Sequence, residues 1–166
     1  MKKLLFLDID GVLNNVGQMV CKQPSRMDAA NLSKDAVKIV EWICDTTGAQ
    51  VYISSTWRIG RTVDWFKGLF EAYGWVNPPI VGLTPIHNNI NATRGEEILS
   101  VCMAQDEIVE YVILDDDSDM LPEQLFVKVD PAMGLTIKDA IRVCKLLGVK
   151  PEHEVKFKQI EQFLEY

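Results

Sequence analysis

The chain alternates between short, uninterrupted apolar runs and longer segments in which apolar residues recur every three or four positions. An uninterrupted apolar run is typical of a strand covered on both faces, and the longer spacing is typical of a helix with one buried face. The runs predict strands at residues 3–9, 50–54, 80–83, 110–114 and 125–129. The periodic segments predict helices at residues 34–47, 63–73, 92–103, 137–147 and 152–165.

Residues that cap or stop helices stand at the ends of these segments. A hydroxyl side chain before a helix accepts a hydrogen bond from a first-turn amide, and glycine readily ends a helix. The caps are Ser33, Thr62 and Thr136, and the stops are Gly48, Gly74 and Gly148. Strict alternation of strands and helices predicts an α/β, Rossmann-like three-layer fold with a parallel sheet of about five strands and helices on both faces. We expect one domain over residues 1–166, with a core at about 3–147 and a C-terminal helix at about 152–165.

Composition agrees with a single soluble domain. The chain has 166 residues, of which 48% are apolar and 25% are charged, close to the average for globular proteins. The start, Met1 to Leu7, resembles a signal peptide, but Asp8 and Asp10 interrupt its apolar run too early. Since the apolar runs are also too short to cross a bilayer, we expect no membrane partner.

Cysteine usage bears on the compartment. Cys21, Cys44, Cys102 and Cys144 lie far apart and form no C-x-x-C pair. In a chain of this size, such spacing favours reduced thiols over a disulfide framework. The pattern predicts a cytoplasmic location.

Acidic residues outnumber basic ones, 24 to 17, for a net charge of −7. Proteins that grip the phosphate backbone broadly are usually basic, so we expect no broad nonspecific nucleic-acid binding. A small, locally positive site could still accept the end of a nucleic acid. The surplus carboxylates are compatible with divalent-metal chemistry or with a solvated acidic surface.

The first predicted strand runs into Asp8-Ile9-Asp10-Gly11. Functional residues in parallel sheets gather at the carboxyl ends of strands, and residues two apart on a strand point to the same side. Both carboxylates should therefore face one site, where a divalent cation or a proton would relieve their repulsion. Gly11 permits a tight turn that exposes main-chain amides to a bound anion.

The fourth predicted strand runs into Asp115-Asp116-Asp117-Ser118-Asp119. A buried apolar run followed by consecutive acids suits the oxygen ligands that Mg²⁺ prefers, although an acidic surface loop would show the same residues. Its combination with the acids after the first strand favours a magnesium site.

Hydroxyl residues and an arginine follow the second predicted strand, in Ser54-Ser55-Thr56-Trp57-Arg58. Hydroxyls, amides and a guanidinium can hold phosphate oxygens together. Arg94 opens a predicted helix, where a cation is unfavourable unless an anion lies nearby. Trp57 could stack on a base or pack the loop.

Four segments occur in the order LFLDIDGVLN, VYISSTWR, TRGEEI and YVILDDDSDM. Their order resembles the four motifs of the haloacid dehalogenase (HAD) superfamily of phosphohydrolases. A closer resemblance is to the HAD domains of Swiss Army Knife RNA repair proteins, which share the IVGLTP segment, the Arg-Gly helix start and the Gly134-Leu135-Thr136 helix start. The resemblance covers about residues 3–147.

The resemblance implies catalytic roles for two acids. Asp8 matches the nucleophile that forms an aspartyl-phosphate, and Asp10 matches the general acid that later activates water. The implied Mg²⁺ ligands are the Asp8 carboxylate, the Asp10 carbonyl and a fourth-motif acid. We favour Asp116 for that acid. Asp115 would then hold a metal-bound water or the cation of the third motif, and Asp119 stays open as a further partner at the site.

The resemblance also implies the phosphate-binding set. Ser55 best matches the second-motif hydroxyl, with Ser54 and Thr56 as open alternatives. Arg94 stands where the superfamily usually has lysine, and Gly11 and Arg58 complete the expected substrate-binding residues.

The expected function is Mg²⁺-dependent hydrolysis of a phosphomonoester through an aspartyl-phosphate. The positions where such proteins carry cap insertions are short here, which indicates an open site suited to nucleic-acid ends or nucleotides. The alternatives are a small-metabolite phosphatase and a non-catalytic HAD-like binding domain.

Overall fold

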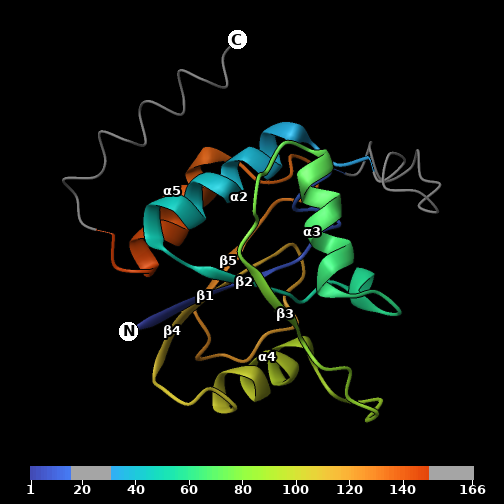
Figure 1. The fold of residues 1–166 in the computed structure, drawn as a ribbon. Coiled ribbons are helices and arrows are strands. Elements are labelled where there is room, and N and C mark those ends of the chain that lie inside the picture. Colours follow the sequence, from blue (N-terminus) through green and yellow to red (C-terminus); the bar gives the residue numbers. More distant parts are fainter. Residues whose placement is uncertain (16–30, 150–166) are drawn as a thin grey trace.

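Five parallel strands form the centre of the computed structural model, which describes residues 1–15 and 31–149. The strand order is β3-β2-β1-β4-β5, so the first strand lies in the middle (Figure 1). The strands are β1 Lys2–Leu7, β2 Gln50–Ile53, β3 Ile80–Leu83, β4 Val109–Asp115 and β5 Phe126–Lys128.

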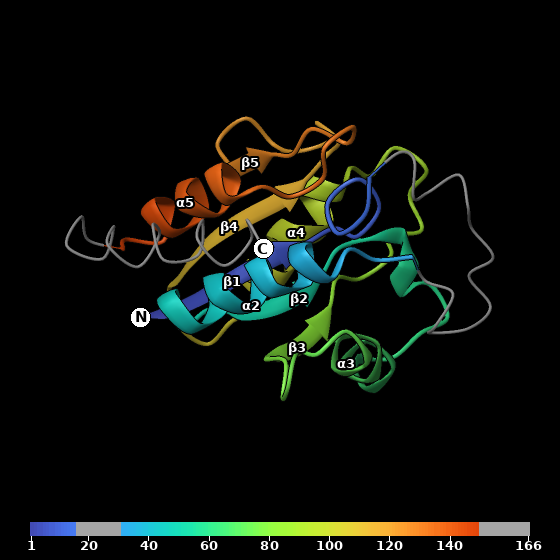
Figure 2. The same ribbon diagram turned by 90° about the horizontal axis from the view of Figure 1, so that it is seen from above.

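Helices cover both faces of the sheet. They are α2 Lys34–Thr47, α3 Val63–Ala72, α4 Arg94–Met103 and α5 Ile137–Leu146, with a 3₁₀ turn η2 at Thr56–Arg58. Helices α2, α3 and α5 lie on one face and α4 lies on the other (Figures 1 and 2). This confirms the predicted three-layer α/β fold.

Alternating residues of β1 supply the two faces of the core. Leu5 and Leu7 pack with the α2, α3 and α5 side, whereas Leu4 and Phe6 pack with Ile98 of α4. These four residues of β1 have no exposed surface, as expected for a central strand of a parallel sheet that is covered on both faces.

The expected helix ends are confirmed at three caps. Ser33, Thr62 and Thr136 each accept a first-turn amide, and Gly48 ends α2 in the left-handed conformation at φ 73°. The helix expected from residue 92 begins instead at Arg94, because Thr93 caps it and Glu96 completes a capping box. The helix expected at 152–165 and most of the loop at 14–27 lie outside the described residues.

Three cysteines are free thiols, as expected. Cys44 and Cys144 are buried and Cys102 is half-buried, while Cys21 lies outside the described residues. Burial raises the pKa of the Cys44 thiol and that of the Cys102 thiol, the latter to about 11, which keeps both thiols protonated and unreactive. Within residues 1–15 and 31–149, the helices are too short or too polar to cross a bilayer.

Candidate active site

The register of the three central strands places their carboxyl ends side by side. Leu7 of β1 pairs with Ile53 on one side and with Leu114 on the other. The next residues are Asp8, Ser54 and Asp115, and the main chain stays paired there. The Asp8 N–H donates to the Leu114 carbonyl at 3.0 Å, and the Ser54 N–H donates to the Leu7 carbonyl at 3.0 Å.

Three carboxylates gather at this edge. Asp8 and Asp115 are 4% and 0% exposed, and Asp116 is half-buried. One carboxylate oxygen from each lies within 4.8 Å of the other two. Gly11 permits the approach of Asp116, since a Cβ at Gly11 would lie 2.6 Å from the Asp116 Cγ, and its φ of 81° disfavours other residues.

Arg94 lies against two of these carboxylates. Its Nη1 is 2.5 Å from the Asp115 Oδ2 and 3.4 Å from the Asp8 Oδ2. The second Asp115 oxygen accepts the Asp117 N–H at 2.9 Å. Asp115 is therefore already held by protein groups, whereas Asp8 and Asp116 face each other beside it.

The start of α4 places Arg94. The Arg94 N–H donates to the Asp119 Oδ2 at 3.0 Å, and the Gly95 N–H donates to the Asp119 carbonyl at 2.9 Å. A carboxylate is favourable at a helix N-terminus, so Asp119 anchors α4 to the loop after β4. A Cβ at Gly95 would lie 2.6 Å from the Leu121 main-chain nitrogen, which explains the glycine after Arg94.

Burial and mutual repulsion govern the protonation of the cluster. Burial raises the pKa of Asp8 to about 8, the charge of Asp115 adds to this, and the Arg94 guanidinium opposes it. Burial also raises the pKa of Asp115, again opposed by Arg94. The single guanidinium of Arg94 does not fully offset the buried negative charge. An acid-rich oxygen cluster with this deficit fits a divalent cation.

Two side chains hold the Asp10 carboxylate. Its Oδ1 accepts the Asn14 Nδ2–H at 3.0 Å, and its Oδ2 accepts the Trp57 Nε1–H at 3.0 Å. Asn14 in turn accepts the Gly11 N–H at 2.8 Å. The hydrogen bond from Trp57 to Asp10 was not predicted from the sequence. The available signal was a tryptophan beside the second motif, because a buried indole N–H needs an acceptor.

The three hydroxyl residues after β2 differ in environment. Ser54 is fully buried, and its Oγ has no hydrogen-bond partner among the residues that the structure describes. The Ser55 Oγ accepts the Trp57 N–H at 3.3 Å and caps η2. Thr56 is exposed. Ser54 is the hydroxyl residue in register with Asp8.

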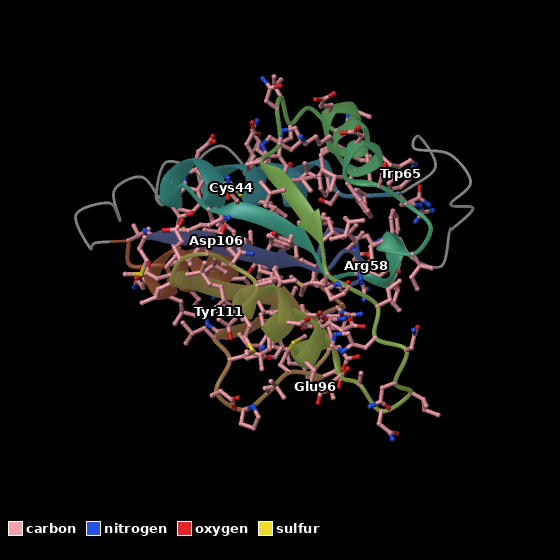
Figure 3. All side chains as sticks on the ribbon, turned by 60° about the horizontal axis from the view of Figure 1, so that its bottom comes forward. Cys44, Arg58, Trp65, Glu96, Asp106 and Tyr111 are labelled. Atoms are coloured by element: carbon pink, nitrogen blue, oxygen red, sulfur yellow. The ribbon has the colours of Figure 1, made fainter. Side chains whose placement is uncertain are left out.

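Arg58 is buried in the wall of the site, on η2 (Figure 3). Each of its guanidinium nitrogens donates to protein, at 2.7–3.2 Å, and together these contacts engage all five N–H groups. The acceptors are the carbonyls of Ser54, Ser55, Thr84 and Pro85 and the carboxylate of Glu97. In this conformation Arg58 joins the ends of β2 and β3 to α4 and presents no N–H to a phosphate.

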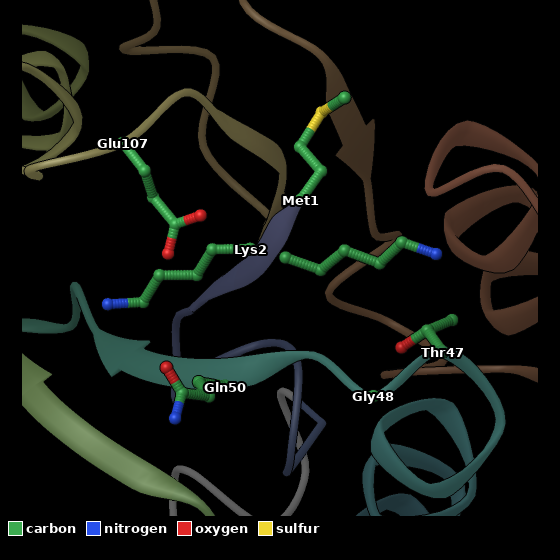
Figure 4. Close-up of a pocket in the computed structure, with 7 residues that line it drawn as sticks. Met1, Lys2, Thr47, Gly48, Gln50 and Glu107 are labelled. Atoms are coloured by element: carbon green, nitrogen blue, oxygen red, sulfur yellow. The ribbon is translucent and has the colours of Figure 1, made fainter.

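A hollow of about 730 Å³ lies at the opposite end of the sheet (Figure 4). Its lining includes Met1, Lys2, Gln50 and Glu107, which precede or begin the strands. Because it lies at the amino ends of β1 and β2, it is remote from the carboxylate cluster.

Comparison with known proteins identifies the family of the chain. The model of the family described as "HAD domain in Swiss Army Knife RNA repair proteins" matches residues 4–140. No curated protein and no solved structure gave a match. The match spans all four motifs and more than half of the chain, and it supports a phosphohydrolase-like function of the HAD type. The chain therefore belongs to the family of HAD domains in Swiss Army Knife RNA repair proteins.

Proposed function

We propose that this protein is a Mg²⁺-dependent phosphomonoester hydrolase that works through an aspartyl-phosphate on Asp8. The observation that carries the proposal is the cluster of buried Asp8, buried Asp115 and half-buried Asp116, in which one carboxylate oxygen from each residue lies within 4.8 Å of the other two. Such a cluster is costly to a fold unless a cation or a proton offsets its charge.

The residues suited to hold the cation are Asp8, Asp116 and the main-chain carbonyl of Asp10. Asp115 accepts hydrogen bonds from Arg94 and from the Asp117 N–H. It would not bind the cation directly, and would instead hold Arg94 in place beside Asp8. When bound, Mg²⁺ would offset charge on the phosphoryl oxygens.

In the first step, an Asp8 carboxylate oxygen attacks phosphorus in line and forms the P–O bond of the aspartyl-phosphate. The bond from phosphorus to the leaving oxygen breaks, and Asp10 gives its proton to that oxygen. The position of Arg94, 3.4 Å from the Asp8 Oδ2, suits it to bind the transferring phosphoryl group.

In the second step, Asp10 accepts a proton from water, whose oxygen attacks phosphorus. The bond between phosphorus and the Asp8 oxygen breaks, which releases phosphate and restores both carboxyl groups. The same side chain thus acts as acid and then as base.

We assign the phosphate-binding hydroxyl to Ser54 in place of Ser55. The register with Asp8 supports this choice, as does the fully buried Ser54 Oγ, which has no hydrogen-bond partner within residues 1–15 and 31–149. A buried hydroxyl without a partner is costly until a ligand binds it. Ser55 already accepts the Trp57 N–H. Thr56, Arg58 and Gly11 would then shape the site around the phosphate.

We further propose phosphorylated nucleic-acid ends or nucleotides as substrates. The family match to RNA repair proteins supports this. The Arg61 guanidinium beside the half-buried Trp65 ring also supports it, since the Arg61 Cζ lies 4.2 Å from the Trp65 ring centroid. Such groups bind phosphates and bases together.

The first test is hydrolysis of p-nitrophenyl phosphate with Mg²⁺ and with EDTA. Turnover should require Mg²⁺, and Asp8→Asn should abolish it. Ser54→Ala should raise KM more than Ser55→Ala does. Turnover that persists in Asp8→Asn would exclude Asp8 as nucleophile.

The substrate class is tested by comparing end-labelled oligonucleotides with a panel of small phosphorylated metabolites. We expect kcat/KM to favour the oligonucleotides by more than about tenfold. Equal or lower values for the oligonucleotides would favour a small-metabolite phosphatase.

A further inference from the structure

Trp57 connects the segment after β2 to the acid that follows β1, 47 positions earlier in the chain. Its indole N–H is 3.0 Å from one Asp10 oxygen, and the Asn14 amide is 3.0 Å from the other. Two donors on opposite oxygens fix the plane of a carboxyl group, whose terminal torsion is otherwise broad.

We infer that Trp57 is a positioning residue for acid–base catalysis by Asp10, an inference that rests on the proposed function. The indole N–H is a hydrogen-bond donor only and does not ionise near neutral pH, so it cannot itself serve as the acid or the base. Trp57 therefore acts through Asp10, by keeping its carboxyl group aimed at the leaving oxygen and then at the attacking water.

The surroundings of Trp57 hold the indole in place. Trp57 is 8% exposed, and its ring centroid lies 6.5 Å from that of Trp65. The Arg61 Cζ is 5.5 Å from the Trp57 ring centroid, and Arg61 Nη1 donates to the Trp57 carbonyl at 3.1 Å. With the Ser55 hydroxyl accepting its main-chain N–H, Trp57 is held at both main chain and ring.

The direction of the two donors restricts where Asp10 can carry its proton. Trp57 Nε1–H and Asn14 Nδ2–H each occupy one lone-pair direction on a carboxylate oxygen, so the transferable proton is excluded from those two directions. Without the indole donor, the carboxyl group could rotate and spend part of its time in unproductive orientations. Proton donation to the leaving group would then weaken, while phosphate binding would not change.

The role of Trp57 can therefore be tested by comparing substrates whose leaving groups differ in basicity. General acid catalysis contributes most when the leaving oxygen is strongly basic, as in an alkyl phosphate, and little when it is weakly basic, as in p-nitrophenyl phosphate. A mere loss of packing would slow both substrates alike. The measured quantity is kcat/KM, which reports the steps up to formation of the aspartyl-phosphate.

The test is Trp57→Phe, which keeps an aromatic ring and removes the N–H. We expect kcat/KM for an alkyl phosphate to fall about 10- to 100-fold, and that for p-nitrophenyl phosphate to change less than about threefold. Retained hydrolysis of the aryl ester also shows that the variant is folded. Trp75→Phe is the matched control, because Trp75 is 2% exposed and packs against Phe70 in the core. We expect Trp75→Phe to affect the two esters equally.

A double-mutant cycle adds a second readout. In an Asp10→Asn background, Trp57→Phe should have no further effect on the alkyl ester, because the group that it positions is gone. Equal losses on both esters, no loss on the alkyl ester, or additivity with Asp10→Asn would overturn the role of Trp57. Failure of the wild-type protein to hydrolyse either ester would instead refute the proposed function and the role of Trp57 with it.

Discussion

Replacing Asp8 by asparagine should abolish turnover and yet raise the free energy of unfolding of the metal-free protein. Asp8 is 4% exposed and lies beside the fully buried Asp115. Asparagine has nearly the shape of a protonated aspartic acid and carries no charge. The substitution therefore removes the repulsion within the cluster and keeps its packing.

The size of the effect follows from the pKa of Asp8, which burial and Asp115 raise from 3.8 to about 8. One pKa unit corresponds to about 1.4 kcal/mol, so the raised pKa of Asp8 lowers the free energy of unfolding by at most about 6 kcal/mol at pH 9 and by about 3 kcal/mol at pH 6. Local relaxation and water reduce such costs. We expect Asp8→Asn to gain about 1–3 kcal/mol at pH 9 and about half of that at pH 6.

The direction of the pH dependence follows from linkage. Because the folded-state pKa of Asp8 is raised, the folded protein keeps a proton that the unfolded chain releases. The contribution of Asp8 to stability is therefore complete below about pH 3.8 and is lost as the pH rises through about 8. Asparagine does not titrate, so the free energy of unfolding of Asp8→Asn does not fall for this reason as the pH rises.

Urea unfolding of both proteins in EDTA, at pH 6 and pH 9, measures this difference. Glu107→Gln is the matched control, because Glu107 is exposed at the opposite end of the sheet, and it should change the free energy of unfolding by less than about 0.5 kcal/mol. Asp8→Asn that destabilises the protein, or stabilises it equally at both pH values, would refute the electrostatic reasoning.

Three further predictions concern the cation and the groups around it. Mg²⁺ should raise the melting temperature of the wild-type protein more at pH 9 than at pH 6, because Asp8 must lose its proton to bind the cation; thermal unfolding that shows equal increments would contradict this. Gly11→Ala should weaken Mg²⁺ binding at least about tenfold by titration calorimetry, because a Cβ at this positive φ collides with the Asp116 carboxylate. Gly95→Ala should destabilise the fold by about 1–3 kcal/mol and lower kcat, since its Cβ would displace the start of α4 and with it Arg94; unchanged urea unfolding and turnover would show that α4 tolerates the methyl group.

Local sequence signals predicted the starts of three described helices, because capping hydrogen bonds act within one helical turn. Ser33, Thr62 and Thr136 capped helices as expected, through hydrogen bonds to amides three residues away. The start of α4 was wrong by two residues, since the Thr93 and Glu96 capping box was not recognised.

The positions of the site aspartates could also be predicted from the sequence. An apolar strand that ends in acids places them at the carboxyl edge of a parallel sheet, whatever the strand order. This put Asp8 and Asp115 at one edge. Their separation, their burial and the position of Arg94 between them required the three-dimensional arrangement.

The sequence by itself determined the alternation of strands and helices, the helix caps and the acids at the strand ends, because these depend on local periodicity and local hydrogen bonds. Only the tertiary structure decided that Ser54 stands in register with Asp8, that the Arg58 guanidinium is bound by protein groups, and that Trp57 donates a hydrogen bond to Asp10. These depend on the register between strands and on hydrogen bonds between residues dozens of positions apart. Neither strand register nor a long-range hydrogen bond produces a periodic pattern in the sequence.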